Sequence, residues 1–288
     1  MKKIWTLIFV ILLTAGCQGT QPEPDAAGLR VYTSFWAMYD FTKTIAGEYA
    51  QVENLVPPGV EPHEWEPSPE DMIKLEQADV FVYSGKGMES WCEKVLASLS
   101  NPDLIVVEAA KSVPEQMQEG SVDPHVWLDP ENAGIQLEAI ADALSQADPK
   151  NQVHYQTNLQ AQQEKLAALD QAYRDTLAAC PKKEIVVSHR AYGYLCNAYG
   201  LEQIPAEGLT ADSDPSPAQL AQIVETMRQK DIHYLFFEEL VQSKALETIQ
   251  AETGAQALVL DPFEGDAENS SYLTVMEKNL QNLKTALE

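Results

Sequence analysis

A long stretch near the middle of the chain, residues 149–179, restricts the possible folds more than any other feature. It contains no glycine, and its only proline is the first residue, Pro149. Its apolar residues recur at steps of three, four or seven, as on one face of a helix: Tyr155, Leu159, Leu166, Leu169, Tyr173 and Leu177. Asp148 suits a helix cap, and Pro149 suits the first helical position. The sequence therefore predicts one helix of about thirty residues, long enough at about 1.5 Å per residue to run the length of a small domain.

On both sides of this helix the sequence alternates between strand and helix signals. Strands are predicted before it at residues 29–35, 78–85 and 103–109, and after it at 184–189, 232–238 and 255–261. Helical periodicity separates them, for example at 131–146 and 216–230. Strands separated by helices indicate parallel sheets. We therefore expect an α/β fold with two lobes, residues 29–148 and 181–288, joined by one long, rigid helix at 149–180.

The N-terminus has the features of an export signal. Two lysines precede the apolar run IWTLIFVILL, which is too short to span a bilayer and fits a signal peptide. The following LTAGC resembles a bacterial lipobox, whose cysteine becomes the lipid-modified first residue. We expect a signal peptide at 1–16, a lipidated Cys17, and a flexible tether through residue 28, which together anchor the protein outside the cytoplasmic membrane. The alternative is an ordinary secretory signal with an incidental cysteine.

Composition excludes one class of partner. The formal net charge of −25 gives no basic face to meet phosphates, so we expect no nucleic-acid partner. The 45% hydrophobic content is enough for a substantial core. The charge itself does not identify a ligand.

Three of the five histidines occupy comparable places. His63 lies in VEPHEWEPSP, where the prolines stiffen a loop that can aim a side chain. His125 lies in DPHVWLDP, again between prolines, and His189 ends the predicted strand EIVVSH. Carboxyl ends of strands are where open α/β sheets bind ligands. The alternative for each is an exposed or packing histidine, which is what we expect of His154 and His233.

One carboxylate shares this placement. Asp261 directly follows the predicted buried strand ALVL, and Pro262 stops that strand from continuing. Glu239 stands just after the strand IHYLFFE. On position alone, each of these acids could equally be a helix cap.

Several motifs in the same order resemble one family, the substrate-binding lipoproteins of bacterial zinc and manganese ABC transporters. They are LVPPGVEPHEWEPSPEDM, ADVFVYSGKGMESW, DPHVWLDPENA, VSHRAYGYL, PSPAQL and LDPF, and they extend over the whole mature chain. The resemblance implies a metal site in the cleft between two lobes, with His63 and His125 from the first and His189 and Asp261 from the second. It also implies a permease and its ATPase as partners, and we expect the binding protein to be a monomer.

Three imidazoles and one carboxylate form a donor set that Zn²⁺ accepts in tetrahedral geometry, whereas Mn²⁺ prefers oxygen-rich sites. In this family, manganese importers tend to carry glutamate at the position of His189, so the resemblance favours zinc and keeps manganese as the alternative. Residues 111–123 contain no histidine, although many zinc-importing relatives have a histidine-rich insert there.

The same donor set argues against an enzyme. Four protein ligands leave no open position for an activated water, so we predict no enzymatic activity. An extracytoplasmic zinc hydrolase is the rival, and a structural lipoprotein or adhesin is a third possibility.

Two further predictions concern supporting residues. Metal-bound histidines usually donate their other ring N–H to a carboxylate or carbonyl, and Glu239 is placed for that role, as the family also suggests. Cys180 precedes the strand EIVVSH, and the following helix AYGYLCNAY should run back along it and bring Cys196 close. In an oxidising location this predicts a disulfide between Cys180 and Cys196, with three buried thiols, Cys92 included, as the alternative.

Overall fold

The computed structural model describes residues 28–118, 120–209, 215–239, 243–265 and 270–288. The predicted signal peptide, the tether up to residue 27 and the lipidation site Cys17 lie outside the described residues. Within these ranges, no helix combines the length and hydropathy that crossing a bilayer requires.

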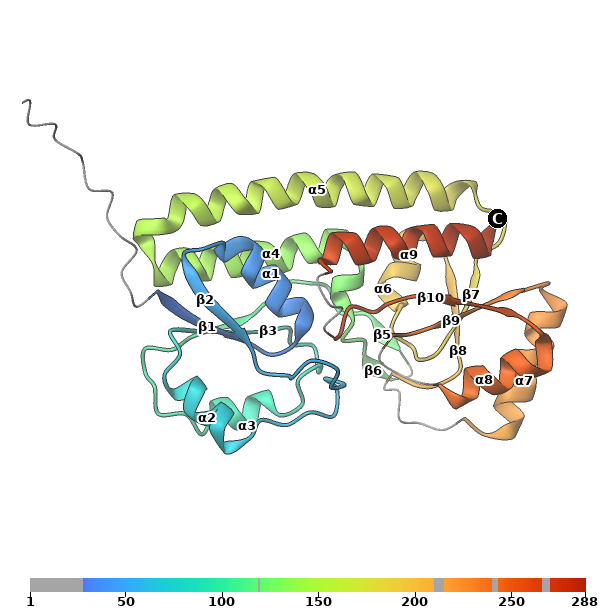
Figure 1. The fold of residues 1–288 in the computed structure, drawn as a ribbon, viewed down its shortest axis with the longest axis horizontal. Helices are drawn as coiled ribbons and strands as arrows, with labels where there is room; N and C mark the ends of the chain where they lie inside the picture. Colours follow the sequence, from blue (N-terminus) through green and yellow to red (C-terminus); the bar gives the residue numbers. More distant parts are fainter. Residues whose placement is uncertain (1–27, 119, 210–214, 240–242, 266–269) are drawn as a thin grey trace, which may run out of the picture.

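The first half of the molecule, from β1 to α4, is built on a parallel sheet with the strand order β2-β1-β3-β4. Its strands are β1 (Leu29–Thr33), β2 (Ala50–Asn54), β3 (Val80–Tyr83) and β4 (Ile105–Glu108). Its helices are α1 (Trp36–Ala46), α2 (Pro69–Glu76), α3 (Cys92–Leu96) and α4 (Pro130–Ala147). Apolar residues of α1 and α4 pack on one face of the sheet, and those of α2 and α3 pack on the other (Figure 1).

Between β4 and α4 the chain forms a short hairpin and a turn. The antiparallel strands β5 (Met117–Gln118) and β6 (Ser121–Val122) make the hairpin, and the 3-10 turn η1 (Val126–Leu128) follows. In Figure 1 this hairpin lies beside the second sheet, next to α6 and β8.

The second half, from β7 to α9, repeats the arrangement with the strand order β10-β9-β7-β8, again parallel. Its strands are β7 (Glu184–Val187), β8 (Glu202–Pro205), β9 (Tyr234–Phe237) and β10 (Gln256–Val259). Its helices are α6 (Gly193–Tyr199), α7 (Pro217–Gln229), α8 (Lys244–Thr253) and α9 (Tyr272–Leu287). Apolar residues of α7 and α8 form a separate cluster, whereas those of α6 and α9 belong to the core shared with the first half.

The predicted long helix is confirmed. The 3-10 turn η2 (Pro149–Asn151) leads into α5 (Gln152–Ala179), and the six predicted apolar residues form its buried face. Figure 1 shows α5 running along both halves, with α4 and α9 packed beneath it. Two parallel α/β sheets joined by one long helix are therefore the observed fold.

The C-terminal helix ties the halves together at a second place. At the start of α9, the Tyr272 hydroxyl donates to the carbonyl of Trp127 at 2.7 Å, and its backbone N–H donates to Asp40 at 3.1 Å. Both partners belong to the first half. Because one apolar core runs beneath α5 through both halves, large independent movements of the two sheets would expose buried surface.

The predicted disulfide is not formed, and Cys92, Cys180 and Cys196 are buried free thiols. The two candidate partners have different surroundings. The Cys180 thiol donates to the carbonyl of Thr176, one helical turn back in α5. Cys196 lies instead in the field of Asp123, which with burial raises the pKa of its thiol. Helix α6 follows β7 in the chain, but Cys196 on it lies near Asp123 of the first half.

Candidate metal centre

Four side chains from distant parts of the sequence direct one ligand atom each to a common point. They are His63, His125, His189 and Glu264, whose ligand atoms all lie within 4.8 Å of one another. The Nε2 atom of His125 is 3.1 Å from that of His63 and 3.4 Å from that of His189. The Glu264 Oε1 atom is 3.1, 3.6 and 3.7 Å from the Nε2 atoms of His125, His63 and His189, respectively.

These separations match a tetrahedral metal site. Ligand atoms at about 2.0–2.1 Å from a zinc ion, at tetrahedral angles, lie about 3.3–3.4 Å apart. Five of the six separations, at 3.1 to 3.7 Å, surround that value, and the sixth is within 4.8 Å. One small cation therefore fits between the four side chains without moving them far.

The site lies where the carboxyl edges of the two sheets face each other. His63 lies in the loop between β2 and α2, and His125 lies between the hairpin and η1. His189 follows β7, and Glu264 follows β10. Each half thus contributes two ligand atoms, at the strand ends where α/β sheets place their sites.

Local packing holds the first-half loops in position. Trp65, two residues after His63, packs edge-on against Trp91 with ring centroids 5.3 Å apart. At the end of the same loop, Ser68 caps α2. The buried Trp127 of η1 donates its indole N–H to the carbonyl of Pro262 at 2.7 Å. This last bond joins the turn after His125 directly to the turn that carries Glu264.

Two of the three imidazoles are held by buried carboxylates. Asp123 Oδ1 lies 2.8 Å from Nδ1 of His125 and also accepts the His125 backbone N–H at 3.0 Å. Glu238 Oε1 lies 2.6 Å from Nδ1 of His189, and the Ser188 hydroxyl donates to the same carboxylate. A proton held on Nδ1 leaves the Nε2 lone pair free to bind a metal.

The structure gives Glu238 the supporting role that the sequence had suggested for Glu239. The Glu239 carboxylate turns to the surface, where it accepts a hydrogen bond from Lys278 at 2.9 Å. Glu239 is half-exposed, whereas Glu238 is buried against His189, so only Glu238 can hold that ring. Asp123, two residues before His125, was not considered a supporting residue, although its proximity in sequence was a usable signal.

Asp261 also lies outside the group of four ligand atoms, and Glu264 takes the place predicted for it. The Asp261 carboxylate accepts the backbone N–H of Phe263 at 2.8 Å, and its own N–H donates to Asn279 at 2.9 Å. Its short side chain therefore stabilises the turn after β10. Phe263 has a φ of 60°, and this left-handed residue redirects the chain so that Glu264 points back to the histidines.

Comparison with known proteins identifies the family. A family model described as zinc-uptake complex component A, periplasmic (ZnuA), matches residues 31–286. The chain belongs to this family. It is 35% identical over 317 residues to the high-affinity zinc uptake system protein ZnuA of Bacillus subtilis, covering 100% of this chain and 99% of that protein. Members of the ZnuA family are solute-binding proteins and not enzymes, which confirms the prediction of no enzymatic activity.

Two solved structures of relatives extend the likeness. The Zn(II)-bound ZnuA-like domain of AdcA from Streptococcus pneumoniae has a TM-score of 0.81 and 38% identity, over 91% of this chain and 99% of that domain. Full-length AdcA, named a zinc-binding lipoprotein, is longer, and the match spans 61% of its length. The second structure is the laminin-binding protein Lmb of Streptococcus agalactiae, which is described as having adhesin and metal-transporting activity. It has a TM-score of 0.85 and 30% identity, over 91% of this chain and all of Lmb.

The pKa values of the ligands at this ZnuA-family site are shifted by their neighbours. Burial alone would raise the pKa of Glu264, but the nearby side chains of His125, His189 and His63 hold that pKa well below its usual range. Burial opposes protonation of His125 and His189, yet the carboxylates of Asp123, Glu238 and Glu264 outweigh it and raise both pKa values. Glu264 therefore favours its charged form, and His125 and His189 bind protons more readily than free histidine does.

The Glu264 Oε1 atom gives a direct test of fit. It is buried and close to His125 Nε2, yet it makes no well-aligned hydrogen bond. The Nε2 atoms of His63 and His189 lie 3.1 and 3.4 Å from that of His125, so three nitrogens and this oxygen crowd around one centre. Such an arrangement suits a shared cation better than a set of pairwise hydrogen bonds.

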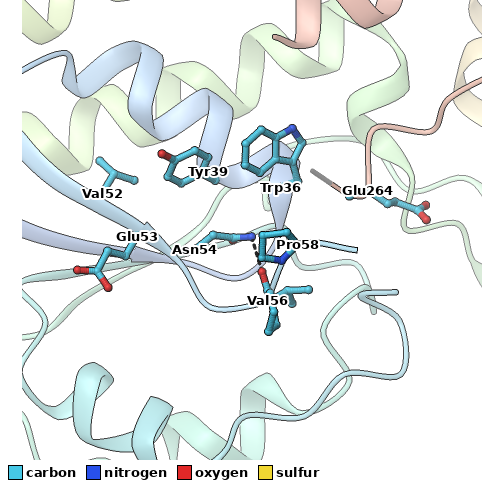
Figure 2. Close-up of a pocket in the computed structure, with 10 residues that line it drawn as sticks. Trp36, Tyr39, Val52, Glu53, Asn54, Val56, Pro58 and Glu264 are labelled. Carbon is cyan, nitrogen blue, oxygen red and sulfur yellow. Dashed lines mark hydrogen bonds between the residues drawn. The ribbon is translucent and has the colours of Figure 1, made fainter. Parts of the chain in front are cut away.

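A wider pocket adjoins the site on the side of β2. Its volume is about 320 Å³, and Trp36, Tyr39, Asn54 and Pro58 are among the residues that line it. Figure 2 shows that the Glu264 carboxylate, at the edge of this pocket, points away from the other lining residues. The Glu264 carboxylate is therefore turned away from the pocket and toward the histidines.

Proposed function

We propose that the protein is the zinc-binding component of an ABC importer, which captures one Zn²⁺ outside the cytoplasmic membrane and delivers it to a permease and its ATPase. The observation that supports this most is the convergence of His63, His125, His189 and Glu264, whose ligand atoms all lie within 4.8 Å of one another. Membership of a family described as a periplasmic component of a zinc-uptake complex also supports this proposal.

The donor set favours zinc over manganese. Three imidazole nitrogens and one carboxylate oxygen satisfy Zn²⁺ with four ligands, whereas Mn²⁺ prefers more oxygen ligands and a higher coordination number. The name of the similar Bacillus subtilis protein and the Zn(II)-bound state of the AdcA domain point the same way. Manganese remains the alternative cargo that a competition experiment must test.

Location and anchoring follow from the N-terminus and the relatives. The sequence predicts lipid attachment at Cys17, and the similar AdcA is named a lipoprotein. We infer that the mature protein is held on the outer face of the cytoplasmic membrane by this lipid, within reach of its permease.

Release of the metal requires the ligands to separate. Each half supplies two ligand atoms, so movement of either pair of loops breaks the tetrahedral site. The shared core beneath α5 resists a wide opening of the two halves. We therefore infer that docking on the permease moves the loops around His63 and Glu264 more than the two sheets.

Metal binding by the purified protein from residue 18 onward tests the proposal. We expect one zinc per chain by elemental analysis, and competition with a chromophoric chelator should show zinc bound far more tightly than manganese. X-ray absorption at the zinc edge should report four nitrogen or oxygen ligands at about 2.0 Å. Preferential binding of manganese, or a zinc site with fewer than three imidazoles, would contradict it. Loss of zinc uptake by cells lacking the protein would support the transport role.

A further inference from the structure

The segment of residues 114–123, which contains the β5–β6 hairpin, belongs to the first half but makes several hydrogen bonds with the second half. The Tyr194 hydroxyl of α6 donates to the carbonyl of Pro114 at 2.9 Å and accepts the backbone N–H of Gln116 at 3.0 Å. Tyr194 is only 5% exposed, so both bonds are shielded from water. This segment, which contains no histidine, is called the hairpin segment below.

Side-chain amides link the hairpin segment to one metal-site histidine. The Gln118 amide donates to Asp123 Oδ2 at 2.9 Å, and the other carboxylate oxygen of Asp123 holds the ring and backbone of His125. Asp123 is fully buried, so its two oxygens have fixed partners. The orientation of the His125 imidazole therefore depends on where Gln118 places this carboxylate.

The same chain of hydrogen bonds continues into the second half. Gln203 of β8 donates its amide to Gln118 Oε1 at 3.3 Å and accepts the backbone N–H of Tyr192 at 3.1 Å. Tyr192 stands three residues after His189. The turns that carry two of the proposed ligands, one from each half, are thus joined behind the site through Asp123, Gln118 and Gln203.

A close approach at the start of α6 makes this junction possible. A Cβ atom added at Gly193 would lie 1.7 Å from Nε2 of Gln118 and 2.3 Å from Oδ2 of Asp123. Both distances are far below van der Waals contact, so any side chain at this position must displace the two groups. Glycine here allows the helix to touch the carboxylate that orients His125.

We propose that Gly193, Tyr194 and Gln203 are positioning residues for the metal site, acting through the hairpin segment and Asp123 on His125. This inference rests on the proposed function, because it concerns how tightly the same site keeps its metal. Separation of the two halves at this junction would release Gln118, loosen Asp123 and let the His125 ring turn. The junction therefore couples contact between the halves to the rate of zinc release.

Replacement of Gly193 by alanine tests the coupling, with Gly134→Ala as the matched control. Gly134 lies in α4, and a Cβ atom there would meet only Leu166, at the ordinary contact distance of 3.8 Å. Zinc-loaded protein is mixed with excess chelator in a stopped-flow instrument, and the zinc dissociation rate is recorded. We expect Gly193→Ala to release zinc about tenfold faster than the wild type. This is the lower end of the loss that follows mutation of groups that hold a metal-binding histidine. We expect Gly134→Ala to release zinc at the wild-type rate.

A second variant covers the case in which Gly193→Ala does not fold. Gln203→Leu keeps the side-chain volume similar but removes the amide bonds to Gln118 and Tyr192, and it should also speed zinc release several-fold. Melting temperatures with and without zinc separate the coupling from a merely structural role. A positioning role reduces the rise in melting temperature that zinc produces, whereas a structural role lowers both temperatures equally.

The outcomes separate this inference from the proposed function. If the wild type binds zinc tightly, but Gln203→Leu and a folded Gly193→Ala release it at the wild-type rate, the positioning role is overturned and the proposed function is not. Failure of the wild type to bind zinc would overturn both. Faster release in the two variants but not in Gly134→Ala would support the coupling.

Discussion

The four proposed ligands differ in how the molecule holds them. His125 and His189 have side chains that are 0% and 1% exposed, and each ring is fixed by a buried carboxylate. His63 and Glu264 stand on loops that follow β2 and β10, which are edge strands of their sheets. We call the first two the fixed pair and the other two the loop pair. The difference indicates that the fixed pair defines the site and the loop pair completes it, one member from each half.

The largest expected effect comes from removing a member of the fixed pair. If the four ligands share equally a zinc-binding free energy of about 10–16 kcal/mol, one ligand contributes about 2.5–4 kcal/mol, or roughly 100- to 1,000-fold in affinity. We expect His125→Ala at the upper end of this range, because it also removes the ring that pairs with the buried Asp123 carboxylate. His63→Ala should lie at the lower end, since water can take the place of its ring.

Chelator competition on both alanine variants measures this contrast, with circular dichroism to show that each has folded. Equal losses in the two variants would remove the distinction between the fixed pair and the loop pair. An unchanged zinc affinity in His125→Ala would contradict the site itself.

Proton competition should have the next largest effect. The pKa values of His125 and His189 are raised above 6.5, so both rings bind protons more readily than free histidine and must lose them to bind zinc. Two displaced protons change the affinity by up to about 100-fold per pH unit. We expect the zinc affinity to fall at least about 100-fold between pH 7.5 and pH 5.5. A flat profile over this range would exclude imidazole ligands of raised pKa.

The stability of the metal-free protein should follow pH in the opposite direction. A histidine whose pKa is raised on folding stabilises the protein fully below the unfolded pKa of about 6.5, and that contribution is lost as the pH rises through the folded pKa. The pKa of Glu264 is lowered, so its contribution is present above about pH 4.5 and is lost as the pH falls through its folded pKa. The melting temperature without zinc should therefore be higher at pH 6 than at pH 8.

A comparison of two nearby acids tests the carboxylate of the loop pair. We expect Glu264→Gln to weaken zinc binding by roughly 30- to 100-fold, because a neutral amide oxygen is a poorer ligand than a carboxylate. Asp261→Asn should change the affinity only a few-fold, since an asparagine carbonyl can still accept the N–H of Phe263. The reverse ranking in chelator competition would restore Asp261 as the ligand.

The sequence predicted the fold and the three histidines, and it was less informative about the acids. The long helix and the alternating strands follow from periodicity, which depends on many residues at once. The histidines are few, and their loops are framed by prolines or end a strand. The acidic residues are many, and position relative to a strand end does not reveal where a carboxylate points. Glu264 is directed to the site by the left-handed turn at Phe263, a backbone conformation without a firm sequence signal.

The same limitation applies to the supporting residues and the thiols. Glu238 and Glu239 are adjacent acids at one strand end, and only the direction of their side chains separates them. Cys196 lies on the helix that the sequence predicted, but its thiol lies near Asp123 and the Cys180 thiol lies against α5. Such details depend on the exact direction of individual side chains. A hydrophobic pattern shows which face of a helix or strand is buried, but it does not fix that direction.

The smallest effect that we predict distinguishes Glu238 from Glu239. Glu238→Gln should weaken zinc binding about tenfold, because the amide supports the His189 ring less firmly and no longer supplies a negative charge to its N–H. Glu239→Gln removes the same charge one residue away, where it pairs with Lys278 at the surface, and should alter the affinity by less than about twofold. The pair is a matched test, because both variants change the net charge equally and long-range attraction of the cation is weakened alike. Equal losses in the two variants would mean that the acids act through their field, and the supporting bond to His189 would then have no special role.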